Sequence, residues 1–554
     1  MPPGSFMDCY IDKKTGTYAE TLEAVGLASA ARELGFRGVR VTDKGTHFHI
    51  HSEQDSVAHG VLSAGYPYIW LKSKEPECPT IRFLDYEGEK EKRDAAKKVG
   101  KKAKTVLDAV EIEAPAVHPD LNPATMLASM RKGWNGDRDL ALWIAAQPEQ
   151  AAAWVLFRLG LGAQPSEKFP EVSNTQILNP ISGKGVHGGK TEIRSAGSLP
   201  DQLVDPFSEW MKMRGLWGAA LLYRSDDDFK FFVIEPADIA VDEIERLRSA
   251  LQAENLWGGV QLDIYAALQC TRILILQSDA VQEGTKQDGT KSIRLRGRRP
   301  RAVIAGLRQA YFKSLGTAAA LMNDAFLPLP DWFAIQTEED GNAYLSIIDE
   351  VSAKGGCLKS LQEKHSDDGR VLQQYREWLL SGELPDLLEF HYLFALHLMQ
   401  CLSRKDWARP FGTENLSTLL TRAYEEKHKV TEIIENPGFQ SVARALRNAT
   451  VYALLPNPRH EVRFGIAQKW KQKMKAGNEE FAATVAEFVQ DYNWETARRL
   501  KGKGHSVTTE ELDALLLLIH KRKADIVGAL LLAYGYARAP KVETAQPEEA
   551  ASQA

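Results

Sequence analysis

The residues best suited to chemistry lie in a glycine- and lysine-rich segment that reads NPISGKGVHGGKTEIR from Asn179 to Arg194. Its four glycines allow the backbone to approach a phosphate closely, and Asn179 can read a base edge. The basic side chains that supply donors are Lys184, His187, Lys190 and Arg194. A nucleotide-hydrolysing phosphate loop needs another glycine where Lys184 stands, so we predict nucleic-acid binding, with a flexible surface loop as the alternative.

A second basic segment runs from Lys291 to Arg301 and contains no acidic residue. Its charged residues are Lys291, Arg294, Arg296, Arg298, Arg299 and Arg301. Arginine is well suited to phosphate because its guanidinium donates two parallel hydrogen bonds. The polar, glycine-containing residues from Ala280 onward predict a long mobile loop that ends in this basic tip. We expect the tip to contact nucleic acid, and a solvated loop is the alternative.

Aromatic and basic residues are interleaved in the carboxyl-terminal part of the chain. A helix that begins at Pro437 is expected to carry Phe439 and Leu446 on one face and Arg444 and Arg447 on the other. Further along, Phe464, Trp470 and Trp494 stand among basic residues. The residues expected to contact nucleic acid here are Arg444, Arg447, Arg459, Arg463, Lys469, Lys471, Lys473, Lys475, Arg498 and Arg499. Together they can line a groove for a single strand, although each group alone also fits an exposed helix face.

Two further patterns resemble metal sites. His47, His49 and His51 alternate as residues on one face of a strand do, and Asp226 to Asp228 form a run of carboxylates. A polar strand face and a hydrophilic hairpin turn explain them more simply, so we predict no metal site and no cofactor. The chain also has no His-Asp dipeptide and no Gly-x-Ser-x-Gly elbow. We expect that the protein is not an enzyme, and a metal-dependent nuclease using His49 and Asp227 is the alternative.

Composition favours an intracellular protein with more than one folded domain. The chain has 554 residues, of which 44% are apolar. Its five cysteines are scattered singly, as is typical of a reducing compartment. No leader pattern precedes Tyr10, and no segment reaches the roughly 20 apolar residues that a membrane span needs. We therefore expect a cytoplasmic protein that does not contact a membrane.

The charge is distributed unevenly along the chain. The formal net charge is -5, but residues 390–541 contain 23 Lys and Arg against 16 Asp and Glu. The remainder contains 46 basic and 58 acidic residues. The carboxyl-terminal part is therefore the basic part, which favours a polyanionic partner there.

Apolar spacing predicts an α+β fold. A helix is expected from Tyr18 to Leu34, followed by strands at Gly38–Thr42 and His47–His51, and two more β-rich runs follow at Trp217–Arg224 and Lys230–Glu235. From Asp386 onward nearly every segment has helical spacing. We expect a mixed sheet-and-helix body over 1–385, an all-α helical bundle over 386–538 and a disordered tail over 539–554.

Several segments make the chain resemble a known family, the large subunit of the type I CRISPR Cascade surveillance complex, most closely its type I-B branch. The segments are DKKTGTYAETLEAVGLA near the amino terminus, NPISGKGVHGGK and SLPDQLVDPFSEWMKMRG in the centre, and GFQSVARALRNATV, FVQDYN and GALLLAYGYA in the helical end. The resemblance covers most of the chain. Some relatives carry a zinc-binding cysteine cluster, which this chain lacks.

The resemblance implies a role in antiviral defence without catalysis. Such a subunit binds beside the handle of the guide RNA, recognises the motif (PAM) that flanks the target in double-stranded DNA, and helps to form the R-loop. It then holds the displaced single strand and recruits a nuclease-helicase. Its other partners are the backbone and handle-binding subunits of the complex.

The resemblance also suggests roles for particular residues. It implies motif or handle recognition by Asn179, Lys184 and Lys190, and displaced-strand contact by Arg444, Arg447 and the group from Arg459 to Lys475. In several relatives the helical end is also made separately as a small subunit, and Met399 is placed to start such a product. A protein-protein scaffold, whose basic helices pair with acidic partners, is the remaining alternative.

Overall fold

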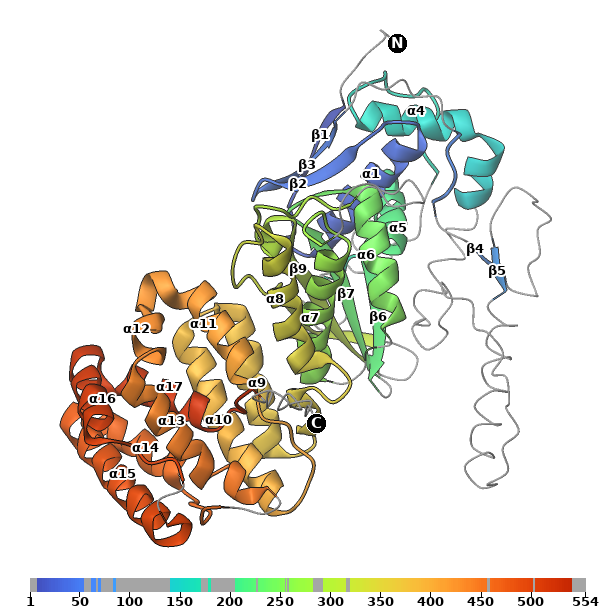
Figure 1. Cartoon of the computed structure of the whole chain (residues 1–554). Coiled ribbons are helices and arrows are strands. Elements are labelled where there is room, and N and C mark those ends of the chain that lie inside the picture. Colours follow the sequence, from blue (N-terminus) through green and yellow to red (C-terminus); the bar gives the residue numbers. More distant parts are fainter. Residues whose placement is uncertain are drawn as a thin grey trace, which may run out of the picture. The chain divides into compact units, whose positions relative to one another are not determined.

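The computed structural model divides into two compact units, which we describe separately. It describes residues 7–53, 61–65, 68–70, 83–85, 140–170, 178–180, 205–225, 228–254, 256, 259–281, 292–314, 319–455, 459–501 and 504–540. The first unit comprises Met1–Leu262 and Gln269–Leu329, and the second comprises Asp263–Leu268 and Pro330–Ala554 (Figure 1). The division after Leu329 precedes the expected boundary at 385/386, because the helices just after Pro330 pack with the later ones.

The first unit opens with a four-stranded sheet and one long helix. The strand order is β1 (Asp8–Asp12), β3 (His47–Ser52), β2 (Val39–Asp43) and β8 (Asp238–Ala240), with antiparallel neighbours throughout. Helix α1 (Tyr18–Glu33) connects β1 to β2, which are parallel and separated by β3, so these elements form a split β-α-β unit. The predicted helix and hairpin are confirmed.

Local sequence explains these elements. The Thr17 side chain accepts a hydrogen bond from the Ala19 N–H at 3.2 Å and caps the amino end of α1. The chain leaves the helix at Gly35, whose φ of 101° favours glycine. In β3, the alternation places Phe48 and Ile50 in the core at 0% exposure, while the intervening histidines are half-buried on the opposite face.

A second antiparallel sheet completes the first unit. Its order is β10 (Ala319–Pro328), β9 (Ile304–Ser314), β7 (Asp228–Pro236) and β6 (Ala220–Ser225). The remaining elements here are β4 (Tyr68–Trp70), β5 (Phe83–Asp85), α4 (Pro148–Arg158), α5 (Pro206–Ala219), α6 (Val241–Ala253), α7 (Val260–Leu276), part of which belongs to the second unit, and the short η3 (Pro300–Ala302). Helices α1 and α5 cross closely, and glycines at the crossing make this possible. A Cβ atom at Gly26 would collide with the Met211 carbonyl, and one at Gly215 with the Leu22 carbonyl.

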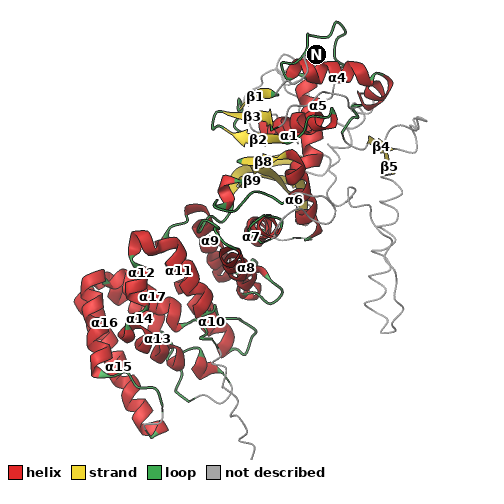
Figure 2. Cartoon of the chain, turned by 45° about the horizontal axis from the view of Figure 1, so that its top comes forward, coloured by secondary structure: helices red, strands yellow, loops and turns green. Residues whose placement is uncertain are grey.

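The second unit is built almost entirely of helices in the residues that the structure describes. They are α8 (Glu338–Ser352), η4 (Cys357–Ser360), α9 (Ser366–Ser381), α10 (Leu384–Ser403), α11 (Thr413–His428), α12 (Val430–Ile434), α13 (Pro437–Ala449), η5 (Tyr452–Leu454), α14 (Ile466–Ala476), α15 (Asn478–Leu500), α16 (Thr509–Arg522) and α17 (Ala524–Gly535). Figure 2 shows strands confined to the part of the chain before these helices. The predicted fold class, α+β followed by a helical bundle, is confirmed.

Candidate nucleic-acid interface

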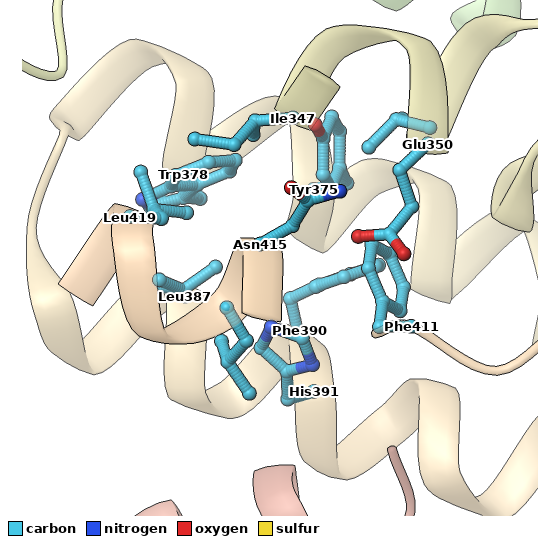
Figure 3. Close-up of a pocket in the computed structure, with 12 residues that line it drawn as sticks. Ile347, Glu350, Tyr375, Trp378, Leu387, Phe390, His391, Phe411, Asn415 and Leu419 are labelled. Atoms are coloured by element: carbon cyan, nitrogen blue, oxygen red, sulfur yellow. The ribbon is translucent and has the colours of Figure 1, made fainter. Parts of the chain in front are cut away.

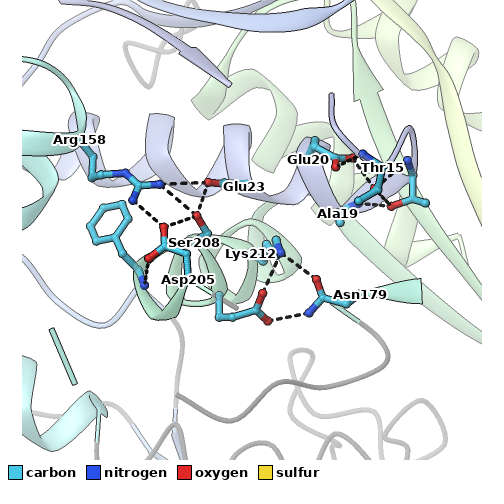
Figure 4. A network of polar contacts seen from close by, with 12 residues as sticks. Thr15, Ala19, Glu20, Glu23, Arg158, Asn179, Asp205, Ser208 and Lys212 are labelled. Atoms are coloured by element: carbon cyan, nitrogen blue, oxygen red, sulfur yellow. Dashed lines mark hydrogen bonds and ion pairs between the residues drawn. The ribbon is translucent and has the colours of Figure 1, made fainter. Parts of the chain in front are cut away.

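The glycine- and lysine-rich segment is described only at its beginning. Asn179 and Pro180 lie in the described part, whereas Lys184, His187, Lys190 and Arg194 lie outside it. The Asn179 side chain is 3% exposed and donates to Glu209 Oε2 at 2.8 Å, while its oxygen accepts from Lys212 Nζ at 2.8 Å (Figure 4). Both ends of the amide are therefore used inside the protein, so the structure does not support base reading by Asn179.

The segment returns to the same helix at its other end. Asp205 caps α5 by accepting a hydrogen bond from the Phe207 N–H at 3.3 Å, and its carboxylate also pairs with Arg158 (Figure 4). Partial burial opposes ionisation, but Arg158 and Ser208 outweigh it and lower the pKa of the Asp205 carboxyl. Since Asn179 bonds to Glu209 on the same helix, the described residues on either side of the gap 181–204 both contact the amino-terminal half of α5.

The arginine-rich segment is anchored, which corrects the prediction of a mobile basic tip. Ile293 and Leu295 are 0% exposed, and Ile293 forms a parallel bridge with Ser278. The Asp279 Oδ1 atom accepts the backbone N–H groups of Leu295 and Arg296, each at 2.8 Å. The described part of this segment, from Ser292 onward, is therefore packed against the first unit, and Lys291 lies outside it.

Acidic partners for these arginines come from distant parts of the sequence. Arg294 donates two hydrogen bonds to Glu53, both at 3.0 Å, and Arg298 pairs with Asp238 at 2.9 Å. Arg296 donates to the Asp279 carbonyl and Arg301 to the Leu329 carbonyl, and Arg299 also has interactions. The positive charge of this segment, which contains no acidic residue, is thus largely compensated by groups elsewhere in the fold. The Arg294 side chain nevertheless remains 65% exposed.

Arg447, which was predicted to contact nucleic acid, and Trp470, which stands among the predicted basic residues, are both buried. Arg447 is 7% exposed and donates to the backbone carbonyls of Tyr534 at 2.9 Å and Ala537 at 2.7 Å. It therefore holds the carboxyl end of α17, and burial lowers the pKa of its guanidinium. Trp470 is 1% exposed and contacts Phe481 and Phe488 edge-on, so it belongs to the core and cannot stack a base.

The lysines of α14 face acidic residues. Lys469 pairs with Glu487 at 2.8 Å, Lys471 with Glu389 at 2.5 Å and Lys473 with Glu480 at 2.9 Å. Each of these lysine side chains is at least a quarter exposed, so the pairs are weak and a phosphate can compete for the ammonium group. These lysines are available only at the cost of an existing ion pair.

Another surface combines exposed rings with cations that lack a partner among the described residues. Trp494 is 63% exposed and Phe464 62% exposed, and the Arg498 guanidinium lies 4.7 Å from the centre of the Trp494 indole. Arg459, whose charge acts on His460, and Lys501, at the end of α15, are also exposed. We call this set of five residues the Trp494 surface.

Buried contacts hold the two segments of this surface together. Glu495 accepts the backbone N–H of Glu461 at 2.6 Å and pairs with Arg463 at 3.0 Å, while Arg499 pairs with Glu461. The buried His460 ring stacks on Tyr492 at 4.8 Å. Burial lowers the pKa of His460, and the nearby Arg463, Arg499 and Arg459 lower it further, which shows how closely cations gather here.

The exposed Arg444 extends this cationic region on α13. Its charge contributes to the electrostatic environment of Tyr492, which also accepts a hydrogen bond from Asn448 at 2.9 Å. Of the two arginines predicted on this helix, Arg444 is therefore exposed beside α15, and Arg447 is buried. One helical turn thus separates Arg444, which is accessible to a ligand, from Arg447, which is bonded inside the fold.

A Ser-His-Asp alignment appears in the second unit that no sequence motif indicated. His397 Nδ1 lies 2.8 Å from Asp368 Oδ1, and His397 Nε2 lies 3.0 Å from Ser360 Oγ. The backbone N–H groups just after Ser360 are already used, that of Leu361 by Leu358 and that of Gln362 by Asp368. These two N–H groups are therefore not free to stabilise an oxyanion.

One pocket of the second unit, lined by residues of α8 to α11, is too small for a cofactor. It measures about 20 Å³, enough for roughly one water molecule, and is lined by Glu350, Tyr375, Trp378 and His391 among others (Figure 3). Burial lowers the pKa of His391 to about 3, so this ring is neutral. Glu350 is fixed by the Gly412 N–H at 2.7 Å.

The histidine strand, whose pattern resembles a metal site, has no group of metal ligands in the described residues. There, no three His, Cys, Asp or Glu side chains come together as metal ligands. His49 contacts Asp8 instead, and Asp226 and Asp227 lie outside the described part. No helix in this part is long and apolar enough to cross a membrane.

Comparison with known proteins gives no family assignment. A scan against models of protein families finds none that matches this chain, and a search of curated proteins finds no match either. The resemblance to the Cascade large subunit therefore stays a prediction.

Proposed function

We propose that this chain is a non-catalytic, nucleic-acid-binding subunit of an RNA-guided antiviral DNA surveillance complex, equivalent to the large subunit of a type I Cascade. It recognises the motif that flanks the target, stabilises the opened duplex and recruits the nuclease-helicase. Its partners are the guide RNA, the target duplex, the displaced strand and the other subunits of the complex. It acts in the cytoplasm.

The Trp494 surface is the observation that carries this proposal. An indole at 63% exposure loses contact with water when a base stacks on it, and any base presents a suitable face. Arg498 lies over one face of that indole, so a base would stack on the other face with a positive charge close to its phosphate. Rings and cations in this arrangement fit a single strand better than a duplex, whose bases are already stacked.

The charges of the second unit support the same partner. Arg444, Arg459, Arg498 and Lys501 are exposed without an acidic partner among the described residues. Each can neutralise a phosphate without first breaking an ion pair. The paired lysines of α14 add further contacts if phosphates displace their carboxylates, but they contribute less.

The glycine- and lysine-rich segment supplies the donors for a recognition element. Asn179, at its start, and Asp205, eleven residues after its end, are both held at α5. We assign motif or handle contact to Lys184, His187, Lys190 and Arg194 and leave Asn179 a structural role. We also propose that the exposed arginines between Arg294 and Arg301 contact nucleic acid.

Fluorescence anisotropy with a labelled single-stranded DNA tests the proposal. Stacking on a tryptophan contributes about 1–3 kcal/mol for each base, so Trp494→Ala should weaken binding roughly tenfold. Trp407→Ala is the matched control, because this indole is 56% exposed in the same unit and belongs to no proposed site. Equal affinity of the two variants, or binding to acidic proteins only, would favour the scaffold alternative.

A further inference from the structure

The polar face of the first sheet carries a row of rings. Phe48 and Ile50 on β3 face the core, so Tyr10 on β1 and the three histidines of β3 project from the other face. Tyr10 pairs in register with His49, and their rings stack at 4.8 Å with an interplanar angle of 11°. His49 in turn stacks on His51 at 4.6 Å, and His47 meets the Tyr10 ring edge-on at 5.1 Å.

Arginines continue this row across the sheet. Arg40 on β2 pairs in register with His51 and contacts Asp238 at 2.9 Å and Glu53 at 3.6 Å. The same two carboxylates hold Arg298 and Arg294. The fold therefore brings the histidine strand and the arginine-rich segment, 241 residues apart between Glu53 and Arg294, to one surface.

Acidic and basic side chains lie at opposite edges of this surface. Asp8 and Asp12 lie on β1, beside the rings, while three arginines share two carboxylates on the β2 and β8 side. Negative potential therefore gathers at one edge and a positive excess at the other. A ligand with flat rings and an anionic backbone fits with one ring on the outer face of Tyr10 and its anionic groups on Arg294 and Arg298.

We propose that this face, which we call the ring face, binds a short stretch of unpaired nucleotides. One base stacks on the outer face of the Tyr10 ring, because His49 covers the inner face and is itself enclosed by Tyr10 and His51. Arg294 and Arg298 hold the adjoining phosphates by exchanging a carboxylate for a phosphate oxygen. Tyr10 is 54% exposed and the Arg294 side chain 65% exposed, so both are accessible. Paired bases cannot reach a flat sheet with their faces, so the occupant is single-stranded.

This inference rests on the proposed function in that both need a nucleic-acid partner, but it uses a different unit of the chain and different residues. The bundle of the second unit supplies the Trp494 surface, and the sheet of the first unit supplies the ring face. The two sites can therefore be tested separately in the full-length chain.

Photocrosslinking with halogenated oligonucleotides tests the ring face. The full chain is mixed with short single strands that carry 5-iodouridine or 5-iododeoxyuridine, irradiated, digested and analysed by mass spectrometry. Crosslinks on peptides that contain Tyr10 or His49 are expected, and an excess of unlabelled single strand should remove them while an equal amount of duplex should not. The RNA and DNA arms show which kind of single strand occupies the face.

Three variants sharpen the test. Tyr10→Ala should reduce crosslinking in the first sheet about tenfold, since one stacked base is lost, and Tyr10→Phe should retain it. Arg294→Glu should reduce it as well, although it leaves the rings in place. Trp407→Ala, an exposed ring in the other unit, should leave it unchanged.

The outcomes separate this inference from the proposed function. Crosslinks confined to peptides around Trp494 would overturn the ring face and leave the proposed function standing. Crosslinks in the first sheet that persist in both Tyr10→Ala and Arg294→Glu would also overturn it. Absence of any crosslink or binding to either oligonucleotide would overturn both.

Discussion

Arg444 and Arg447 lie one turn apart on α13, and replacing each by alanine should have opposite consequences. Arg447 is 7% exposed and donates to the Tyr534 and Ala537 carbonyls at 2.9 and 2.7 Å. Arg444 is exposed. Arg447→Ala should therefore destabilise the second unit, whereas Arg444→Ala should weaken nucleic-acid binding with little effect on stability.

The magnitude follows from the two hydrogen bonds. A hydrogen bond that involves a charged group contributes about 1.5–3 kcal/mol, and two carbonyls at the end of α17 would lose their donor. We expect Arg447→Ala to lower the free energy of unfolding by about 3–5 kcal/mol. Arg444→Ala should change it by less than about 0.5 kcal/mol, as is usual for an exposed residue.

Urea unfolding of the full chain, followed by circular dichroism at a helical wavelength, measures this difference. The helical unit should unfold at a clearly lower urea concentration in Arg447→Ala than in the wild type or in Arg444→Ala. Anisotropy with single-stranded DNA, at a temperature where all three proteins are folded, measures binding. Equal unfolding midpoints, or weaker DNA binding by folded Arg447→Ala than by Arg444→Ala, would refute the structural role of Arg447.

Three more predictions concern stability. Gly26→Ala should lower the melting temperature of the first unit, at a cost of about 1–3 kcal/mol for overpacking. Gly218→Ala should have less effect, because its Cβ would meet side chains and no backbone, namely Val25 at 3.3 Å and Glu245 at 3.7 Å; equal melting would contradict the close crossing of α1 and α5. Burial lowers the pKa of His391 to about 3 in the folded chain, so below about pH 6.5 the unfolded chain binds one proton more. The free energy of unfolding should therefore fall as the pH drops from about 6.5 toward 3. His391→Leu should flatten this pH dependence in urea titrations, and an unchanged pH dependence would contradict the burial of a neutral His391. Asn179→Ala should lower the melting temperature, since it removes a donor to the buried Glu209, and an unchanged melting curve would contradict its anchoring role.

Local patterns allowed much of the fold to be predicted. The helix after Thr17 and the strand of alternating histidines follow from capping and from a period of two, and both depend only on neighbouring residues. The basic segments were harder, because their partners are distant in the sequence. Glu53 cannot be matched to Arg294, nor Asp238 to Arg298, before the sheet is known.

Some errors at the candidate site had signals in the sequence. Ile293 and Leu295 alternate with Arg294 and Arg296, which is typical of an ordered extended segment and not of a mobile tip. Trp470 follows Ile466 and precedes Met474 at helical spacing, which indicates a core position. Arg447 stands one turn after the buried Ala443, at the border of the apolar stripe, but its carbonyl partners on α17 are visible only in the fold.

The salt dependence of single-stranded DNA binding tests the central claim most directly. Arg459, Arg498 and Lys501 of the Trp494 surface, together with Arg444, are exposed and have no acidic partner among the described residues, and four phosphate contacts predict a slope of about -3 in log affinity against log salt. Affinity should then fall roughly fiftyfold between about 50 and 200 mM salt, and Trp494→Ala should weaken binding at every salt concentration with the same slope. Affinity that does not change with salt, or no measurable binding at the lowest salt, would contradict the claim that this surface holds a single strand.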